Sequence, residues 1–187
     1  FTCVGTGSFK YFELDEFDKV YGTVPPNEKN AAQYIIVEAD ADGRVLIRPY
    51  DVITQRFFGY EWLVETPWEP DSFKYTDDRY LTNVKPYFAD DAKLAFAVDG
   101  DSVTVNFDQA MIDEDRINDY KVTIRRKSDK AIVKQVCFWS RYYLNDMPET
   151  IEQKIEELDK GEYIAEITAR GFWNNKSTNK LVGEFAI

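Results

Sequence analysis

The chain has 187 residues, of which 44% are hydrophobic and 16% aromatic, and its formal net charge at pH 7 is −11. This composition supports a packed core and argues against disorder, and the negative charge disfavours binding to nucleic acid or to an anionic membrane surface. The sequence contains no histidine, so the commonest general base and the commonest transition-metal ligand are both missing.

The remaining candidate groups are carboxylates, hydroxyls and lysines, and their spacing matches no recognised catalytic pattern. Three short runs resemble pieces of phosphate or calcium loops, but each lacks the residues that would complete one: Gly5–Ser8, Asp40–Gly43 and Asp113–Asp115. Turns and solvated loops are the simpler interpretation. We therefore expect no catalytic, cofactor-binding or metal-binding residue in this chain, and no apolar run is long enough to span a bilayer.

Residues 1–68 carry a pattern that predicts mainly β-strands. The β-prone runs 34–39 and 44–52 flank Asp42-Gly43, a pair typical of hairpin turns because glycine accepts a positive φ. Residues 56–65 form a third candidate strand, and the prolines within 20–30 indicate an exposed loop. The following connector, residues 66–91, shows no sustained period, with a short helix expected near Tyr80.

From residue 91 onward, short apolar runs recur at about ten-residue spacing, which predicts an antiparallel sandwich. Tyr120, Val122 and Ile124 alternate with polar residues and should face the core. We place the domain boundary so that residues 1–88 form a β-rich segment and residues 89–187 form the sandwich. The predicted strands of the sandwich are 93–98, 102–107, 119–126, 131–139, 162–169 and 181–187.

One short helix is predicted after Pro148. Thr150 and Gln153 match a capping box, and Gly161 would end the helix. An apolar stripe follows at positions i, i+4 and i+7, namely Ile151, Ile155 and Leu158. The expected fold class is therefore mainly β: an antiparallel immunoglobulin- or fibronectin III-like sandwich, a smaller β-rich segment before it, and one short helix.

The closing run 158–177 contains a Leu-x-x-Gly-x-Tyr pattern, then alternating apolar residues, then an Asn- and Ser-rich turn. This run resembles the end of a fibronectin type III domain. The resemblance implies that Tyr163 is a corner tyrosine, with its ring in the core and its hydroxyl bonded to the backbone.

The earlier runs 30–38, 42–52 and 59–64 are similar to the final strands of calcineurin-like metallophosphoesterase domains. In exported members of that family a sandwich domain often follows these strands. The family binds two metal ions through Asp-x-His, Gly-Asp, Gly-Asn-His and Gly-His-x-His elements. The three elements that contain histidine are absent here, and the Gly-Asp pair at Gly100-Asp101 lies in a predicted turn.

The resemblance implies a non-catalytic C-terminal region with a structural or positioning role. Its partner would be an upstream catalytic domain of the same polypeptide, which would hold two divalent metal ions and hydrolyse phosphoesters in an extracellular or cell-envelope location. The first residues, Phe1–Phe9, already look like a buried strand and turn, which predicts that the chain was excised from something longer.

A different class of function stays open, namely a free-standing module that binds a glycan or a protein through exposed aromatic rings. Trp62, Trp68 and Trp139 are the candidate residues, although aromatic clusters more often pack a core or a seam between two units. The sequence also leaves open whether Cys3 and Cys137 form a disulfide or remain ordinary core thiols.

Overall fold

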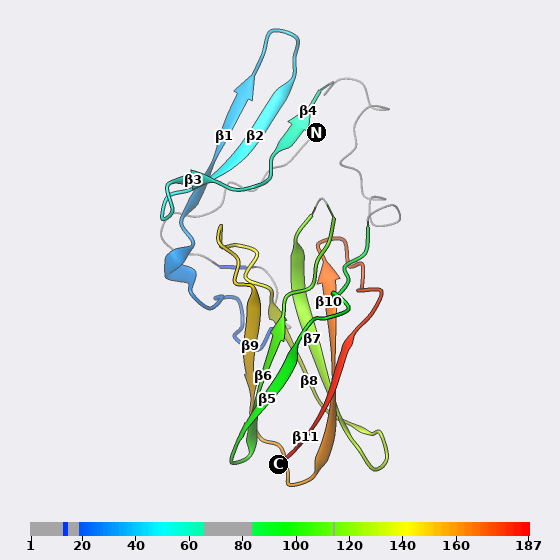
Figure 1. The fold of residues 1–187 in the computed structure, drawn as a ribbon. Helices are drawn as coiled ribbons and strands as arrows, with labels where there is room; N and C mark the ends of the chain where they lie inside the picture. Colours follow the sequence, from blue (N-terminus) through cyan, green and yellow to red (C-terminus); the bar gives the residue numbers. More distant parts are fainter. Residues whose placement is uncertain (1–12, 15–18, 66–83, 114) are drawn as a thin grey trace.

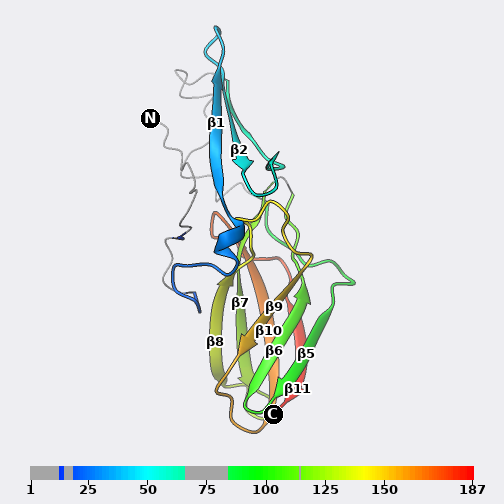
Figure 2. The same cartoon turned by 90° about the vertical axis from the view of Figure 1, so that its left-hand side faces the viewer.

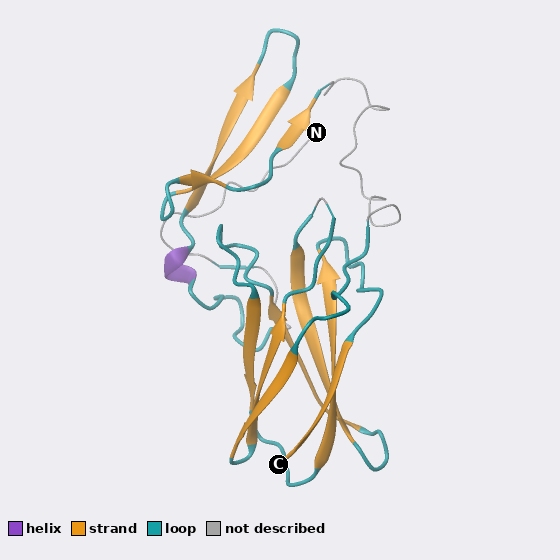
Figure 3. Ribbon diagram, in the orientation of Figure 1, coloured by secondary structure: helices purple, strands orange, loops and turns teal. Residues whose placement is uncertain are grey.

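The computed structural model describes residues 13–14, 19–65, 84–113 and 115–187. Antiparallel strands dominate this part of the chain, arranged as a sandwich with a smaller sheet at one end (Figures 1 and 3). The mainly β fold class is therefore confirmed. No helix among the described residues is long and apolar enough to cross a bilayer.

The sandwich consists of two antiparallel sheets with the three-plus-four arrangement of a fibronectin III-like fold. One sheet has the order β5-β6-β9 and the other has the order β11-β10-β7-β8. The strand bounds are Leu94–Asp99 (β5), Ser102–Asp108 (β6), Ile117–Arg126 (β7), Ile132–Trp139 (β8), Thr150–Ile155 (β9), Glu162–Gly171 (β10) and Leu181–Ala186 (β11).

Alternating side chains of both sheets form the main core. Tyr120, Val122 and Ile124 on β7 are buried as predicted, and Val103, Val105 and Phe107 face them from β6. The predicted corner tyrosine is also present, because Tyr163 is buried and its hydroxyl donates a 2.7 Å hydrogen bond to the carbonyl of Asp159. Period-two alternation was therefore a reliable guide to the core.

The predicted helix is wrong, because Thr150–Ile155 is strand β9 and pairs antiparallel with β6. Ile151 and Ile155 lie opposite Phe107 and Val103, and both isoleucines are buried. A spacing of four places two side chains on one face of a strand as well as on one face of a helix. The only helical segment among the described residues is a 3₁₀ turn, η1, at Glu28–Asn30.

The smaller sheet contains β1 (Gln33–Ala39), β2 (Val45–Asp51), β3 (Arg56–Phe57) and β4 (Trp62–Val64). The predicted hairpin joins β1 to β2, with Gly43 at a φ of 82°. The third predicted strand is instead split into β3 and β4, which pair with different halves of β2. This sheet projects beyond the loop end of the sandwich, away from the C-terminus (Figure 2).

The predicted connector lies largely outside the described residues, since residues 66–83 and the helix expected near Tyr80 are not described. Phe88, the last residue of the predicted first segment, is 1% exposed and packs in the sandwich core. The boundary at residues 88 and 89 stays a prediction.

Candidate interaction surfaces

The three tryptophans singled out from the sequence have different environments. Trp139 is 1% exposed and stacks on Tyr21, with the two ring centroids 5.8 Å apart. Trp62 is half-buried beside Tyr60, and Trp68 lies outside the described residues. Trp139 therefore packs in a seam, which is the simpler of the two interpretations of the sequence, and the alternative of an exposed Trp139 ring that binds a ligand does not hold.

A cluster of charges connects residues 19–31, which we call the N-terminal segment, to the sandwich. The Lys19 ammonium lies 2.9 Å from a carboxylate oxygen of Asp119, and both side chains are fully buried. Arg170 donates to the same carboxylate through Nε at 2.6 Å and also through its terminal nitrogen. Because Lys19 precedes the small sheet while Asp119 and Arg170 belong to β7 and β10, this cluster joins the two parts of the chain.

The same segment lies along strand β8 and continues the contact. Lys19 forms a parallel bridge with Cys137, and the amide of Val20 donates to the Cys137 carbonyl at 3.0 Å. Cys137 is half-buried in this contact, and its candidate disulfide partner Cys3 lies outside the described residues. The incoming chain therefore covers part of the outer edge of β8, which limits unwanted strand pairing there.

A second apolar cluster lies between the segment and the loop that follows β8. Ala31, Trp139 and Tyr143 are its buried members. The Tyr143 hydroxyl donates a 2.7 Å hydrogen bond to the carbonyl of Pro26. Burial raises the pKa of the Tyr143 hydroxyl to about 12, against the smaller opposing effect of the Arg141 charge, so this group stays protonated at neutral pH.

The small sheet also contacts the loop end of the sandwich directly. The Arg116 guanidinium lies 4.8 Å from the ring centroid of Tyr60 and donates to the carbonyl of Tyr142 at 2.8 Å. Arg56 and Asp146 form an ion pair at 2.6 Å. These contacts and the buried cluster together form the seam between the small sheet and the sandwich.

One face of the small sheet carries a row of aromatic rings that sequence reasoning missed. Tyr34 on β1 pairs with Tyr50 on β2, and Tyr50 pairs with Phe57 on β3. Successive ring centroids lie 5.1 and 5.2 Å apart. The Arg48 guanidinium stacks 4.4 Å from the centroid of Phe57 and pairs with Glu38. We call these five residues the aromatic row.

A signal for the aromatic row was present in the sequence. A hairpin centred on Asp42 places residues 34 and 50 opposite each other, which is the register that the structure has. Side chains two residues apart on a strand share a face, so Arg48 and Tyr50 had to project together. The register, not the composition, brings the rings side by side.

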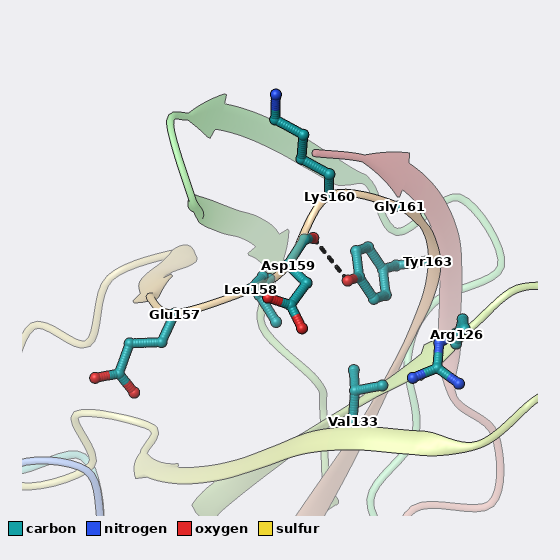
Figure 4. A pocket seen from close by; sticks show the side chains of 8 residues that line it. All are labelled: Arg126, Val133, Glu157, Leu158, Asp159, Lys160, Gly161 and Tyr163. Atoms are coloured by element: carbon teal, nitrogen blue, oxygen red, sulfur yellow. Dashed lines mark hydrogen bonds between the residues drawn. The ribbon is translucent and has the colours of Figure 1, made fainter.

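A polar pocket of about 330 Å³ lies at the other end of the sandwich, beside the turn before β10. Figure 4 shows the Tyr163 hydroxyl bonded to the Asp159 carbonyl, while the charged end of Lys160 points away from the ring. The central polar group of this pocket is therefore part of the tyrosine corner. Its lining residues are Arg126, Val133, Glu157, Leu158, Asp159, Lys160, Gly161 and Tyr163.

The described residues contain no group of three or more histidine, cysteine, aspartate or glutamate side chains placed to hold a metal ion. The chain has no histidine at all, so its donor set does not fit the two-metal site of the family that its sequence resembles. No family model matches the sequence, and no curated protein matches it either.

Proposed function

We propose that this chain is the non-catalytic C-terminal region of a larger, exported metal-dependent phosphoesterase. Its first part would be the closing strands of the catalytic domain, and its sandwich would support and position that domain. The similarity of runs 30–38, 42–52 and 59–64 to the final strands of calcineurin-like domains suggests this origin.

The observation that carries the proposal is the incomplete cover of the small sheet. In the described part of the chain, β1 pairs only with β2. Val37 on this strand is 55% exposed, although β-strands rich in such residues normally pack against a second layer. Ile47, Pro49 and Val64 on the same face are buried, although Ile47 lies directly opposite Val37 and Val64 lies farther from the sandwich. An upstream domain that covered the β1 side of this face would complete it.

The seam supports a positioning role. Lys19 and Asp119 are buried where the N-terminal segment meets the sandwich, and the half-buried Arg170 pairs with the same carboxylate. Such a cluster tolerates little displacement because an unpaired buried charge is costly. A domain attached to the small sheet would therefore keep a defined orientation relative to the sandwich.

The coding sequence upstream of Phe1 tests the origin. We expect an open reading frame with Asp-x-His, Gly-Asp, Gly-Asn-His and Gly-His-x-His elements in that order. A start codon or an export signal directly before the Phe1 codon would overturn the proposal.

A hydrolysis assay tests the non-catalytic part of the proposal. The chain should hydrolyse p-nitrophenyl phosphate with added Mn²⁺ no faster than a buffer blank, whereas the extended protein should turn it over. Hydrolysis by the 187-residue chain well above the blank would contradict the assignment.

A further inference from the structure

We propose that β1 is a dimerisation edge, along which a second copy of this chain adds its own β1 in antiparallel orientation. The inference goes beyond the phosphoesterase origin, because it concerns the edge of the small sheet, whereas an upstream domain would cover one of its faces. It starts from the backbone of β1, which pairs only with β2 in the described part of the chain.

The hydrogen-bond pattern identifies the backbone groups of β1 that point away from β2. The amide of Val52 donates to the Ala32 carbonyl at 2.8 Å. At the other end of the ladder, the amide of Asp40 donates to the Arg44 carbonyl at 3.1 Å. Hydrogen-bonded and non-hydrogen-bonded pairs alternate along the antiparallel register between them. The even-numbered residues of β1 therefore bond to β2, and the odd-numbered residues project their N–H and C=O groups outward. These residues are Gln33, Ile35, Val37 and Ala39.

The outer edge of β1 lacks the features that usually keep edge strands apart. The strand contains no proline and no lysine, and its register with β2 has no bulge. Its one charged residue, Glu38, pairs with Arg48. Val37 is 55% exposed, and Ile35 is half-buried on the same face. The edge therefore offers both backbone hydrogen bonds and apolar side chains to an added strand.

A second copy fits this edge because an antiparallel pair centred on Ile36 is self-complementary. In that register residue 33 lies opposite residue 39 of the second copy, and residue 35 lies opposite residue 37, so all the outward-pointing residues of both strands would be hydrogen-bonded. Ile35 would lie beside Val37 of the second copy, and Ile36 beside its own counterpart, which are favourable β-branched pairs. Glu38 would lie opposite Tyr34 of the second copy, so no like charges meet.

The shape of the molecule permits this pairing. The small sheet projects beyond the loop end of the sandwich, and β1 runs away from the sandwich (Figure 1). A two-fold axis through Ile36 therefore places the two sandwiches at opposite ends of the dimer. The net charge of −11 on each copy opposes association. We expect a weak dimer that added salt strengthens, because salt screens this repulsion.

Sedimentation velocity of the 187-residue chain tests the dimer. We expect monomers at about 1 μM and mainly dimers at about 500 μM. Val37→Pro removes an outward N–H without breaking the ladder to β2, and it should lower the association constant at least about tenfold. Val37→Thr is the matched control, since it keeps the N–H and the branched side chain, and it should still dimerise.

A cross-link tests the register. Ile36 would face its counterpart in a non-hydrogen-bonded pair, where Cα atoms lie about 4.5 Å apart and a disulfide can form. In a chain with Cys3→Ser and Cys137→Ser, Ile36→Cys should therefore give a disulfide-linked dimer on mild oxidation. Glu38→Cys should not, although Glu38 is more exposed, because its counterpart would lie about 13 Å away along the strand.

The inference would be overturned by a dimer that Val37→Pro leaves intact, or by equal cross-linking through positions 36 and 38. A monomer at every concentration would also overturn it and would leave the edge to a strand from another protein. If the circular dichroism of Val37→Pro differs from that of the parent chain, Val37→Lys replaces it. This variant keeps every backbone donor but places like charges beside the dimer axis, so it should likewise prevent dimerisation. None of these results bears on the upstream reading frame, so the two proposals fail separately.

Discussion

Gly183 lies where β5 of one sheet and β11 of the other sheet approach each other closely. It lies on β11 opposite Ala165, and a Cβ atom at this position would be 2.6 Å from Cε2 of Phe96 and 3.0 Å from Cδ2 of Leu94. The Phe96 ring cannot easily swing away because it stacks on Phe185 at 5.1 Å. Glycine is therefore required here for packing between β5 and β11.

Gly183→Ala should lower the free energy of unfolding by about 1–3 kcal/mol through overpacking. Urea denaturation followed by tryptophan fluorescence would measure the loss. Gly59→Ala is the matched control, since no atom lies within 4 Å of its added Cβ and its φ is not in the left-handed region. Equal stability of the two variants would contradict the close approach.

Tyr143 should make stability depend on pH in the alkaline range. Its pKa is raised to about 12 in the folded protein by burial, against an ordinary value near 10 in the unfolded chain. The folded state therefore holds the proton more tightly, and this contribution is complete below about pH 10 and is lost as pH rises towards 12. Urea midpoints between pH 8 and pH 11.5 should fall with rising pH.

Tyr143→Phe separates this effect from other alkaline changes. The variant loses the hydrogen bond to Pro26 and should be less stable at pH 8 by about 1 kcal/mol. Its midpoint should then fall less steeply than that of the parent chain, although burial also raises the pKa values of Tyr21 and Tyr120. If the urea midpoints of the variant and the parent chain fell equally with pH, the ionisation of Tyr143 would not destabilise the folded state.

At the scale of a single element, β9 shows where a local pattern misleads. Thr150 followed by Gln153 matches a helix start, and Ile151 and Ile155 match a helical stripe. The same residues form a strand because their backbone pairs with the free edge of β6 and because both isoleucine side chains fit into the core. Tertiary pairing therefore overrides a weak local preference.

Two substitutions distinguish a strand from a helix at this position. Thr150 is exposed at the start of β9, so Thr150→Ala should change the free energy of unfolding by less than about 0.5 kcal/mol. Ile151→Ala should cost about 2–5 kcal/mol because the side chain fills the core. Thermal and urea denaturation would report both. A loss of about 1 kcal/mol for Thr150→Ala would instead indicate a helix N-cap.

At the scale of the whole molecule, the cluster of Lys19, Asp119 and Arg170 holds two parts of the chain together. Asp119→Ala leaves two cations without their carboxylate, and we expect a loss of about 3–5 kcal/mol. Lys19→Met should cost less, because Arg170 continues to pair with Asp119. Asp129→Ala, which breaks the exposed pair with Arg126, should cost at most about 1 kcal/mol.

Limited proteolysis connects this prediction to the orientation of the small sheet. Lys19→Met should increase cleavage within residues 19–31 while leaving β5 to β11 protected, because only the attachment of the segment to β8 is weakened. Two results together would contradict this role of the charges: unchanged cleavage in Lys19→Met, and equal stability of Asp119→Ala and Asp129→Ala. They would show that the charges do not hold the N-terminal segment on the sandwich.

The features that the sequence determined by itself are local. Strand positions and the Asp42-Gly43 hairpin were predictable because alternation and turn chemistry act over a few neighbouring residues. The corner at Tyr163 was predicted from the resemblance of run 158–177 to fibronectin type III domains. The inward faces of Tyr120, Val122 and Ile124 followed from the same alternation. The prediction of a helix at residues 150–160 was wrong because a spacing of four residues places side chains on one face of either a helix or a strand.

Only the tertiary structure decided the features that join distant residues. Lys19 and Asp119 meet because the N-terminal segment pairs with β8, and no local pattern encodes that contact. Trp139 is buried because Tyr21 and Tyr143 enclose it, whereas the rings of Tyr34, Tyr50 and Phe57 become one surface through strand register. Whether a side chain is buried or exposed depends on which distant segments pack together. The free energy of the whole folded chain determines that packing.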